Sequence, residues 1–144
     1  MAVIVYRTEL LEQELEKLCH SLDSVQGAVI VSIEGFVVAS YAPPSDVAVD
    51  DEDEEGATNS PQVAAMAATL IALGERTLAR LAQGDLQRLL LEGETGAMLV
   101  VPASKRAAVA LMVRNDAKMG LSLYSLRRSA LVIGDVLGGD RSNV

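Results

Sequence analysis

The sequence predicts a single-domain α+β protein, and three observations support this class. The chain has 144 residues, close to the commonest domain size, so one hydrophobic core is expected. Its apolar residues follow helical spacing in some segments and form short β-branched runs in others, in the order α-β-β-α-β-β-β-α. Connections of hairpin length join the strands. Helices that separate hairpin-linked strands are typical of α+β rather than doubly wound α/β proteins.

The first helix is predicted over residues 8–22, because leucines recur there at helical spacing between charged residues. Thr8 is the expected N-cap. Residues 25–33 and 36–41 are then predicted to form an antiparallel hairpin. They are separated by Glu34-Gly35, where glycine supplies the positive φ of a tight turn.

Residues 42–59 are predicted to form a flexible acidic loop, because they follow Pro43-Pro44 and carry seven like charges that repel one another. The residues from Asp51 to Gly56 match the start of a calcium-binding EF-hand loop. The match fails at position 12, where Gln62 replaces the bidentate glutamate, so a solvated loop is the better interpretation.

A long central helix is predicted from Ser60-Pro61 to about Gln83, ending before Gly84. The stripe expected to face the core consists of Val63, Met66, Ala67, Leu70, Leu73, Leu78 and Leu81. The opposite side is an alanine ridge, interrupted by Glu75, that consists of Ala64, Ala68, Ala72, Ala79 and Ala82. Small residues let two helices approach closely, so the alanine ridge indicates a helix partner. The alternative is that alanine simply favours helix on an exposed face.

Three further strands are predicted over residues 86–92, 97–101 and 107–114. The last two are almost continuously apolar, which places them in the middle of a sheet. A final helix from Gly120 is expected to end at Gly138-Gly139. Its core face consists of Leu123, Leu126, Ala130, Ile133 and Leu137.

The composition excludes several classes of function. A net charge of -8 and an aromatic content of 3% argue against nucleic-acid binding, which needs clustered cations and stacking platforms. One cysteine and one histidine cannot form a disulfide or the usual zinc site, so we expect no cofactor, no metal and a reducing, cytoplasmic setting. The longest apolar stretch, residues 63–73, is shorter than the roughly 18 residues of a membrane span.

No catalytic motif is found, so the chain is not expected to be an enzyme. Phosphate-binding and dinucleotide-binding glycine patterns are absent from the sequence, as is a G-x-S-x-G elbow. Cys19 and His20 are adjacent, and adjacent helical residues do not face each other, so a buried thiol and a surface imidazole are expected. Arg76 and Arg80 could act as arginine fingers on a partner, but solvated or ion-paired side chains are the simpler interpretation.

One stretch is similar to the sequence pattern of a known family: Val25-Gln-Gly-Ala-Val-Ile-Val-Ser-Ile-Glu-Gly-Phe-Val-Val-Ala-Ser40. Together with the element order, the alanine-rich helix and Met119-Gly-Leu-Ser-Leu, it resembles the Roadblock/dynein light chain family, and a lone chain is most similar to the prokaryotic homodimeric branch. The resemblance implies a profilin-like sandwich, with a five-stranded antiparallel sheet and helices on both faces. It also implies a homodimer around the third strand and central helix. Carried onto this chain, the dimer interface comprises Ala64, Ala68, Ala72, Ala79, Leu86, Arg88 and Leu90.

Family members serve as motor subunits, as scaffolds for Rag-type GTPases, or as partners of gliding-motility and polarity GTPases. The resemblance therefore implies a homodimeric, non-catalytic scaffold that binds a small Ras-like GTPase and modulates its nucleotide cycle. Its expected partner-binding residues are Ala68, Glu75, Arg76 and Arg80. One alternative is a light-chain-like structural adaptor without nucleotide-state preference. Another is a small-molecule sensor, although few polar groups converge in this apolar core.

Overall fold

The computed structural model describes residues 2–44 and 61–138, with only the backbone for residues 2–6. The elements in this part of the chain are α1 (Ala2–His20), β1 (Val25–Ser32), β2 (Val37–Tyr41), α3 (Pro61–Arg80), β3 (Leu89–Glu92), β4 (Gly96–Pro102), β5 (Ala107–Arg114) and α4 (Met119–Leu137). The strands form one antiparallel sheet in the order β2-β1-β5-β4-β3. The predicted α+β class and element order are confirmed.

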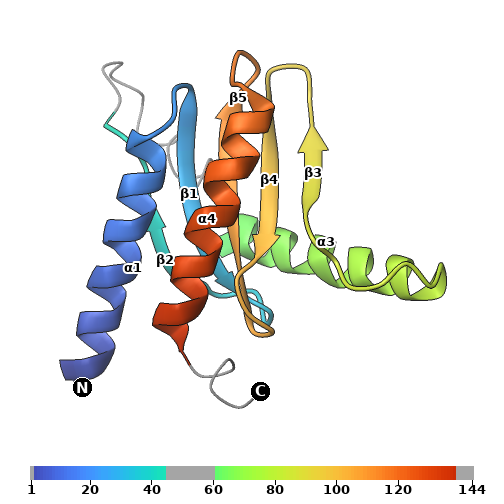
Figure 1. Cartoon of the computed structure of the whole chain (residues 1–144), viewed down its shortest axis with the longest axis horizontal. Helices are drawn as coiled ribbons and strands as arrows, with labels where there is room; N and C mark the ends of the chain where they lie inside the picture. Colours follow the sequence, from blue (N-terminus) through green and yellow to red (C-terminus); the bar gives the residue numbers. More distant parts are fainter. Residues whose placement is uncertain (1, 45–60, 139–144) are drawn as a thin grey trace.

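The sheet lies between two helical layers. Helices α1 and α4 lie side by side along the strands on one face, whereas α3 crosses the opposite face almost at right angles to the strands (Figure 1). Ser129 of α4 donates a hydrogen bond of 2.9 Å to a carboxylate oxygen of Glu14 and so joins the two helices of the first layer. Each face has its own apolar core, one under α1 and α4 and the other under α3.

The hairpin of β1 and β2 forms where the sequence places it. Gly35 has a φ of 96°, the left-handed conformation that glycine adopts without strain. The turn is closed by the Ser32 hydroxyl, which accepts a hydrogen bond of 3.1 Å from the Phe36 backbone N–H. The turn also lies against α3, because a Cβ at Gly35 would come within 3.3 Å of the Ala65 Cα. The predicted antiparallel hairpin is confirmed.

Strands β4 and β5 lie inside the sheet, as predicted from their apolar sequences. Strand β5 pairs with both β1 and β4, and all of its residues except Arg114 are buried. Strand β3 is an edge strand and is shorter than predicted, because it begins only at Leu89. The preceding Leu86 is buried in the core under α3 instead of pairing in the sheet.

Helix α1 begins earlier than predicted, at Ala2, so Thr8 is an interior residue and not the N-cap. A threonine is tolerated inside a helix, where its hydroxyl can bond to the preceding turn, and a capping residue type therefore does not fix a helix start by itself. Helix α4 ends as predicted, with Gly138 at a φ of 67° and its N–H bonded to the Gly134 carbonyl. The predicted acidic loop and Ser60 cap lie outside the described residues.

Two glycines of α4 provide a matched test of this packing. A Cβ at Gly134 would overlap the carbonyl oxygen of Ala103 in the β4–β5 turn, whereas a Cβ at Gly120 would meet open space. We expect Gly134→Ala to lower the free energy of unfolding by about 1–3 kcal/mol through overpacking. Gly120→Ala should leave it unchanged or raise it by up to about 1 kcal/mol. Urea unfolding measures both, and equal effects would contradict close contact between α4 and this turn.

Candidate functional site

Helix α3 packs on the sheet through its small residues. The buried side chains are Ala64, Ala67, Ala68 and Ile71, at the spacing of one helix face. Further along, Gly74 lies against the side chains of Leu86 and Leu89, with Leu86 Cδ1 at 3.6 Å from the position of a Cβ. Methyl groups and a glycine at the contact allow the helix axis to come close to the strands.

The stripe predicted to face the core is therefore wrong for its large residues Met66, Leu73 and Leu81, which are 57%, 58% and 59% exposed. Of the predicted stripe, Ala67 is buried and Leu78 packs against the core under α3. Both sides of α3 are apolar, so helical periodicity could not decide which one faces the sheet. Packing selects the smaller residues, because they allow closer approach to the strands.

The predicted alanine ridge is divided by the same packing. Ala64 and Ala68 are buried within the chain, which contradicts the premise that the whole ridge would face water in a monomer. Ala72, Ala79 and Ala82 are exposed. Of the other predicted interface residues, Leu86 is buried, whereas Arg88 and Leu90 are exposed.

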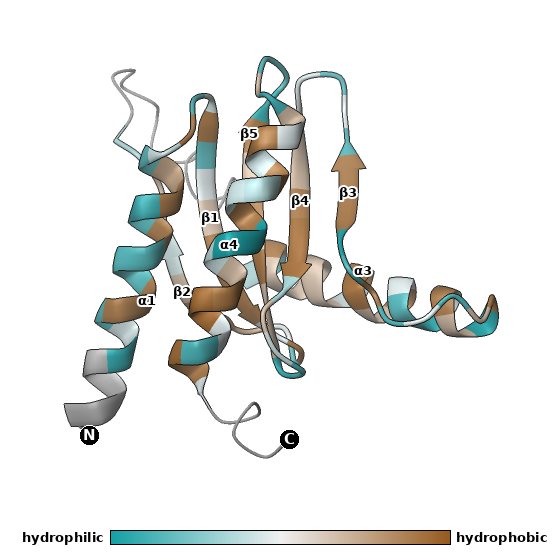
Figure 2. Cartoon of the chain, viewed as in Figure 1, coloured by the Kyte–Doolittle hydropathy of each residue, from teal (hydrophilic) through white to brown (hydrophobic). Residues whose placement is uncertain are grey.

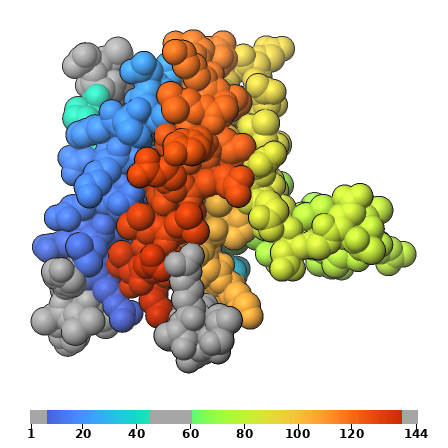
Figure 3. All heavy atoms as spheres, viewed as in Figure 1, coloured from blue at the N-terminus to red at the C-terminus, as the bar shows by residue number. Residues whose placement is uncertain are grey.

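The second half of α3 extends beyond the edge of the sheet (Figures 1 and 3). We call this half of the helix, together with Leu81 directly after it, the overhang, and define it by the residues that line a shallow hollow there: Leu73, Arg76, Thr77, Ala79, Arg80 and Leu81. Next to it lies β3, which has β4 on one side and no strand on the other among the described residues. Leu90 and Leu91 of β3 are about half exposed. Figure 2 shows apolar residues along β3 and at the end of α3.

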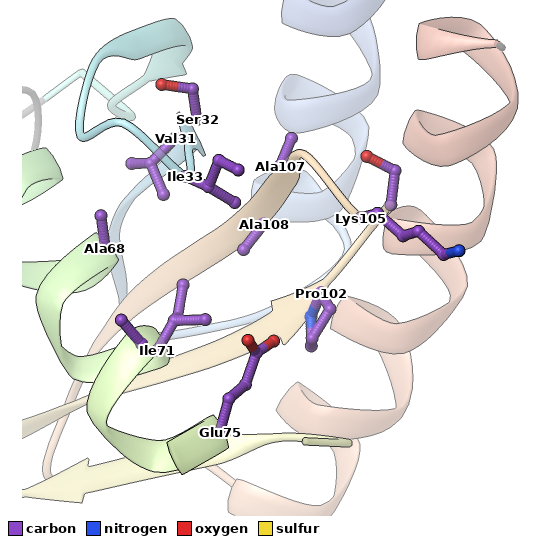
Figure 4. Close-up of a pocket in the computed structure, with 12 residues that line it drawn as sticks. Val31, Ser32, Ile33, Ala68, Ile71, Glu75, Pro102, Lys105, Ala107 and Ala108 are labelled. Carbon is purple, nitrogen blue, oxygen red and sulfur yellow. The ribbon is translucent and has the colours of Figure 1, made fainter. Parts of the chain in front are cut away.

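A separate cavity of about 310 Å³ lies between α3, the β1–β2 turn and the β4–β5 turn (Figure 4). Helix α3 contributes Ala68, Ile71, Ala72 and Glu75. The remaining lining residues are Val31, Ser32, Ile33, Pro102, Ser104, Lys105, Ala107 and Ala108. The four predicted partner-binding residues are therefore not one cluster. Ala68 and Glu75 line the cavity, and Arg76 and Arg80 lie on the overhang.

Cys19 and His20 do not form a nucleophile and base pair. Cys19 is buried, as predicted, and burial raises the pKa of its thiol to about 12. His20 is exposed, and its Nε2 shares a hydrogen bond of 3.0 Å with the Tyr41 hydroxyl. Burial, with smaller contributions from Glu16 and Cys19, raises the pKa of Tyr41 above its ordinary value.

No group of three or more metal-ligating side chains is found in residues 2–44 and 61–138. Within the same ranges, every helix is too short or too polar to cross a bilayer. Sequence reasoning missed two exposed apolar residues of the β1–β2 turn, Ile33 and Phe36. The sequence did contain a signal for this exposure, because a tight turn lies at the surface and large apolar side chains on it cannot easily reach the core.

The family model of the Roadblock/LC7 domain matches residues 11–113, and the chain therefore belongs to the Roadblock/LC7 family. A relative in sequence is uncharacterized protein MJ0310 of Methanocaldococcus jannaschii, which is 31% identical over 110 residues, or 75% of this chain and 83% of that protein.

Solved structures share the fold. The Roadblock/LC7 domain from Streptomyces avermitilis has a TM-score of 0.74 at 18% identity and covers 89% of this chain and 98% of its own. The gliding protein MglB from Thermus thermophilus has a TM-score of 0.76 at 17% identity and covers 90% of each chain. Profilin II from Acanthamoeba castellanii has a TM-score of 0.58 at 14% identity and covers 86% of this chain and 97% of its own. The predicted profilin-like Roadblock fold is thus confirmed.

Cys19 provides a pH-dependent test of the α1 core. A thiol with a raised pKa in the folded state keeps its proton there, while the unfolded thiol ionises near pH 9. Its contribution is therefore complete below pH 9 and is lost as the pH rises from 9 to about 12. We expect the wild-type free energy of unfolding to fall more steeply over this range than that of Cys19→Ala. Parallel slopes for the two proteins would show that the thiol is accessible to water.

Proposed function

We propose that this protein is a homodimeric, non-catalytic scaffold that binds a small Ras-like GTPase and modulates its nucleotide cycle. The observation that carries the proposal is the overhang of α3 beside the unpaired edge of β3. In the described part of the chain, the end of this long helix extends past the last strand (Figure 1), and the exposed side chains there include Leu73 and Leu81. An apolar helix segment beside an open strand edge is an unfavourable surface for an isolated chain.

A second copy satisfies both features at once. Antiparallel pairing of β3 with its symmetry mate around a two-fold axis would supply the missing hydrogen bonds of that edge. It would also bring the two α3 helices onto the same face of one continuous sheet, with each overhang beside the partner's helix. Leu73 and Leu81 would then lose exposure to water against the partner's helix. Leu91 would be covered on the same sheet face, and Leu90 would lie on the other face beside its symmetry mate. This proposed interface keeps the predicted Arg88 and Leu90 but relies on leucines of α3 more than on its alanines.

Membership of the Roadblock/LC7 family and structural similarity to the gliding protein MglB support a GTPase as the partner. The sequence has no phosphate-binding loop of its own, so nucleotide chemistry would belong to the partner. Arg76 and Arg80 are exposed on the overhang, where a partner's switch region could contact them. The reducing cytoplasm is the compartment that this function requires, and the single cysteine fits it.

The dimer is tested by Leu73→Glu combined with Leu81→Glu. Charges on the overhang should prevent its burial, so the variant should sediment with the 15.2 kDa mass of one chain at micromolar concentration, whereas the wild type is expected to have twice that mass. Leu131→Glu is the matched control, because Leu131 of α4 is as exposed as Leu73 and lies on the other side of the sheet. A wild-type monomer, or a dimeric double variant, would contradict the proposed interface.

The GTPase partner is tested with this protein immobilised on a resin. A Ras-like GTPase encoded near its gene is loaded with either GDP or a GTP analogue, and the amount retained on the resin is measured. We expect severalfold stronger retention of one nucleotide state, and weaker retention after Arg76→Ala with Arg80→Ala. Arg127→Ala with Arg128→Ala on α4 removes the same charge from another surface and should change little. Equal retention of both nucleotide states would support the light-chain-like adaptor instead.

A further inference from the structure

The cavity beside α3 remains open in the proposed dimer. Its lining comes from β1, the ends of β4 and β5, the two turns and α3, and none of it comes from β3. In the sheet order, β5 and β4 separate the β1 wall of the cavity from the β3 edge. Pairing through β3 therefore leaves the cavity accessible to a different molecule.

The lining combines an apolar floor with one inward carboxylate. Val31, Ile71 and Ala108 form apolar walls, and the Glu75 carboxylate points from α3 toward Pro102 and Ala108 (Figure 4). Lys105 is the other charged residue of the lining, and its ammonium group points away from the cavity. A group that enters the cavity therefore meets apolar surface first and a negative charge beside it.

The hydroxyls of the lining do not change this charge. Ser32 accepts a hydrogen bond from the backbone N–H of Phe36, and Ser104 accepts one from the backbone N–H of Arg106. Both oxygens thus serve to close their own turns. The ligand chemistry that fits is an aliphatic stem of a few carbons ending in an ammonium or guanidinium group.

The mouth of the cavity indicates the source of this cation. Ile33 lines the cavity and is 55% exposed, and Phe36 of the same turn is 70% exposed. A free amine that fills about 310 Å³ would not cover Phe36, which lies outside the lining. A polypeptide that inserts one basic side chain would cover it with its neighbouring residues. Large apolar side chains left exposed on a turn that borders a pocket are typical contacts of protein interfaces.

We propose that this cavity is a docking site for a partner polypeptide that inserts one arginine or lysine side chain. The stem packs on Val31, Ile71 and Ala108, the cationic group bonds to the Glu75 carboxylate, and an adjacent apolar residue of the partner covers Ile33 and Phe36. The inference rests on the proposed scaffold function only in taking the occupant to be a protein. It assigns Glu75 to a different contact from Arg76 and Arg80.

The test uses the peptide acetyl-Leu-Arg-Leu-amide, titrated into the 15N-labelled full chain and followed by NMR. We expect saturable shifts at the backbone amides of Ile33, Ala72 and Ala108. Replacing the arginine by its neutral isostere citrulline should weaken binding at least about threefold, and Glu75→Gln should do the same, as expected for loss of a partly solvated ion pair. Glu94→Gln is the matched control, because Glu94 is an exposed glutamate in the β3–β4 connection.

A second pair of variants tests the cavity without changing charge. Ala72→Leu would fill the mouth from an exposed position on α3, so the fold should be retained while peptide binding falls at least about tenfold. Ala42→Leu adds the same side chain at an exposed alanine outside both the cavity and the overhang and should leave binding unchanged. Equal binding of the citrulline peptide, or unchanged binding by Ala72→Leu, would overturn the proposal.

Butylguanidinium alone separates a protein side chain from a free amine. If it binds as tightly as the peptide, the site is one for small cations and the proposed docking role is overturned. The titration needs neither a GTPase nor a dimer, so its failure leaves the results of the sedimentation and retention experiments unaffected.

Discussion

The close packing of α3 on the sheet is the contact on which the other features of the molecule depend. Ala64, Ala67 and Ile71 pack in one core with residues of strands β1 and β5, and Ala68 is buried beside them, so three of the four buried side chains of the helix are single methyl groups. Because the small residues make the contact with the strands, the larger residues on the other side of the helix stay exposed. These are Met66, Leu73 and, directly after the helix, Leu81. The same direction of crossing carries α3 past β3 and produces the overhang. Larger residues at the contact would lift the helix and fill the cavity beside Ala68.

Much of the fold could be predicted from local signals. Gly35 and the β-branched runs around it determine the hairpin, and the uninterrupted apolar sequence of β5 is compatible only with a strand covered on both sides. Helix α4 has one apolar face and a glycine C-cap at Gly138. In each case, the residues that carry the signal are also the residues that make the contact. Thr8 is the exception, because a cap signal competes with the rest of the helix and here the helix continues through it.

The orientation of α3 could not be predicted in the same way, because both sides of the helix are apolar. One side of the helix carries small residues and the other carries large ones, and which side faces the sheet depends on how closely the helix can approach the strands. The cavity was equally inaccessible to sequence reasoning. Its walls come from segments as far apart as Val31, Ile71 and Ala108, and no spacing rule joins them. Glu75 was predicted to interrupt the alanine ridge and to contact a partner, but no sequence signal indicated that its carboxylate points into a cavity (Figure 4).

The two proposed binding surfaces of α3 imply different stoichiometries. In the proposed two-fold dimer built on β3, both overhangs would lie near the axis, where one asymmetric partner that contacts both copies would leave no room for a second. The cavity lies away from that edge and occurs once in every chain, so binding there alone would give one partner per chain. A partner that used the overhang and one cavity together would occupy a dimer singly and leave the other cavity empty. Two contacts in one partner also strengthen each other, since the second forms at the high effective concentration set by the first. The ratio of partner to scaffold in a purified complex therefore reports which of the two surfaces dominates recognition.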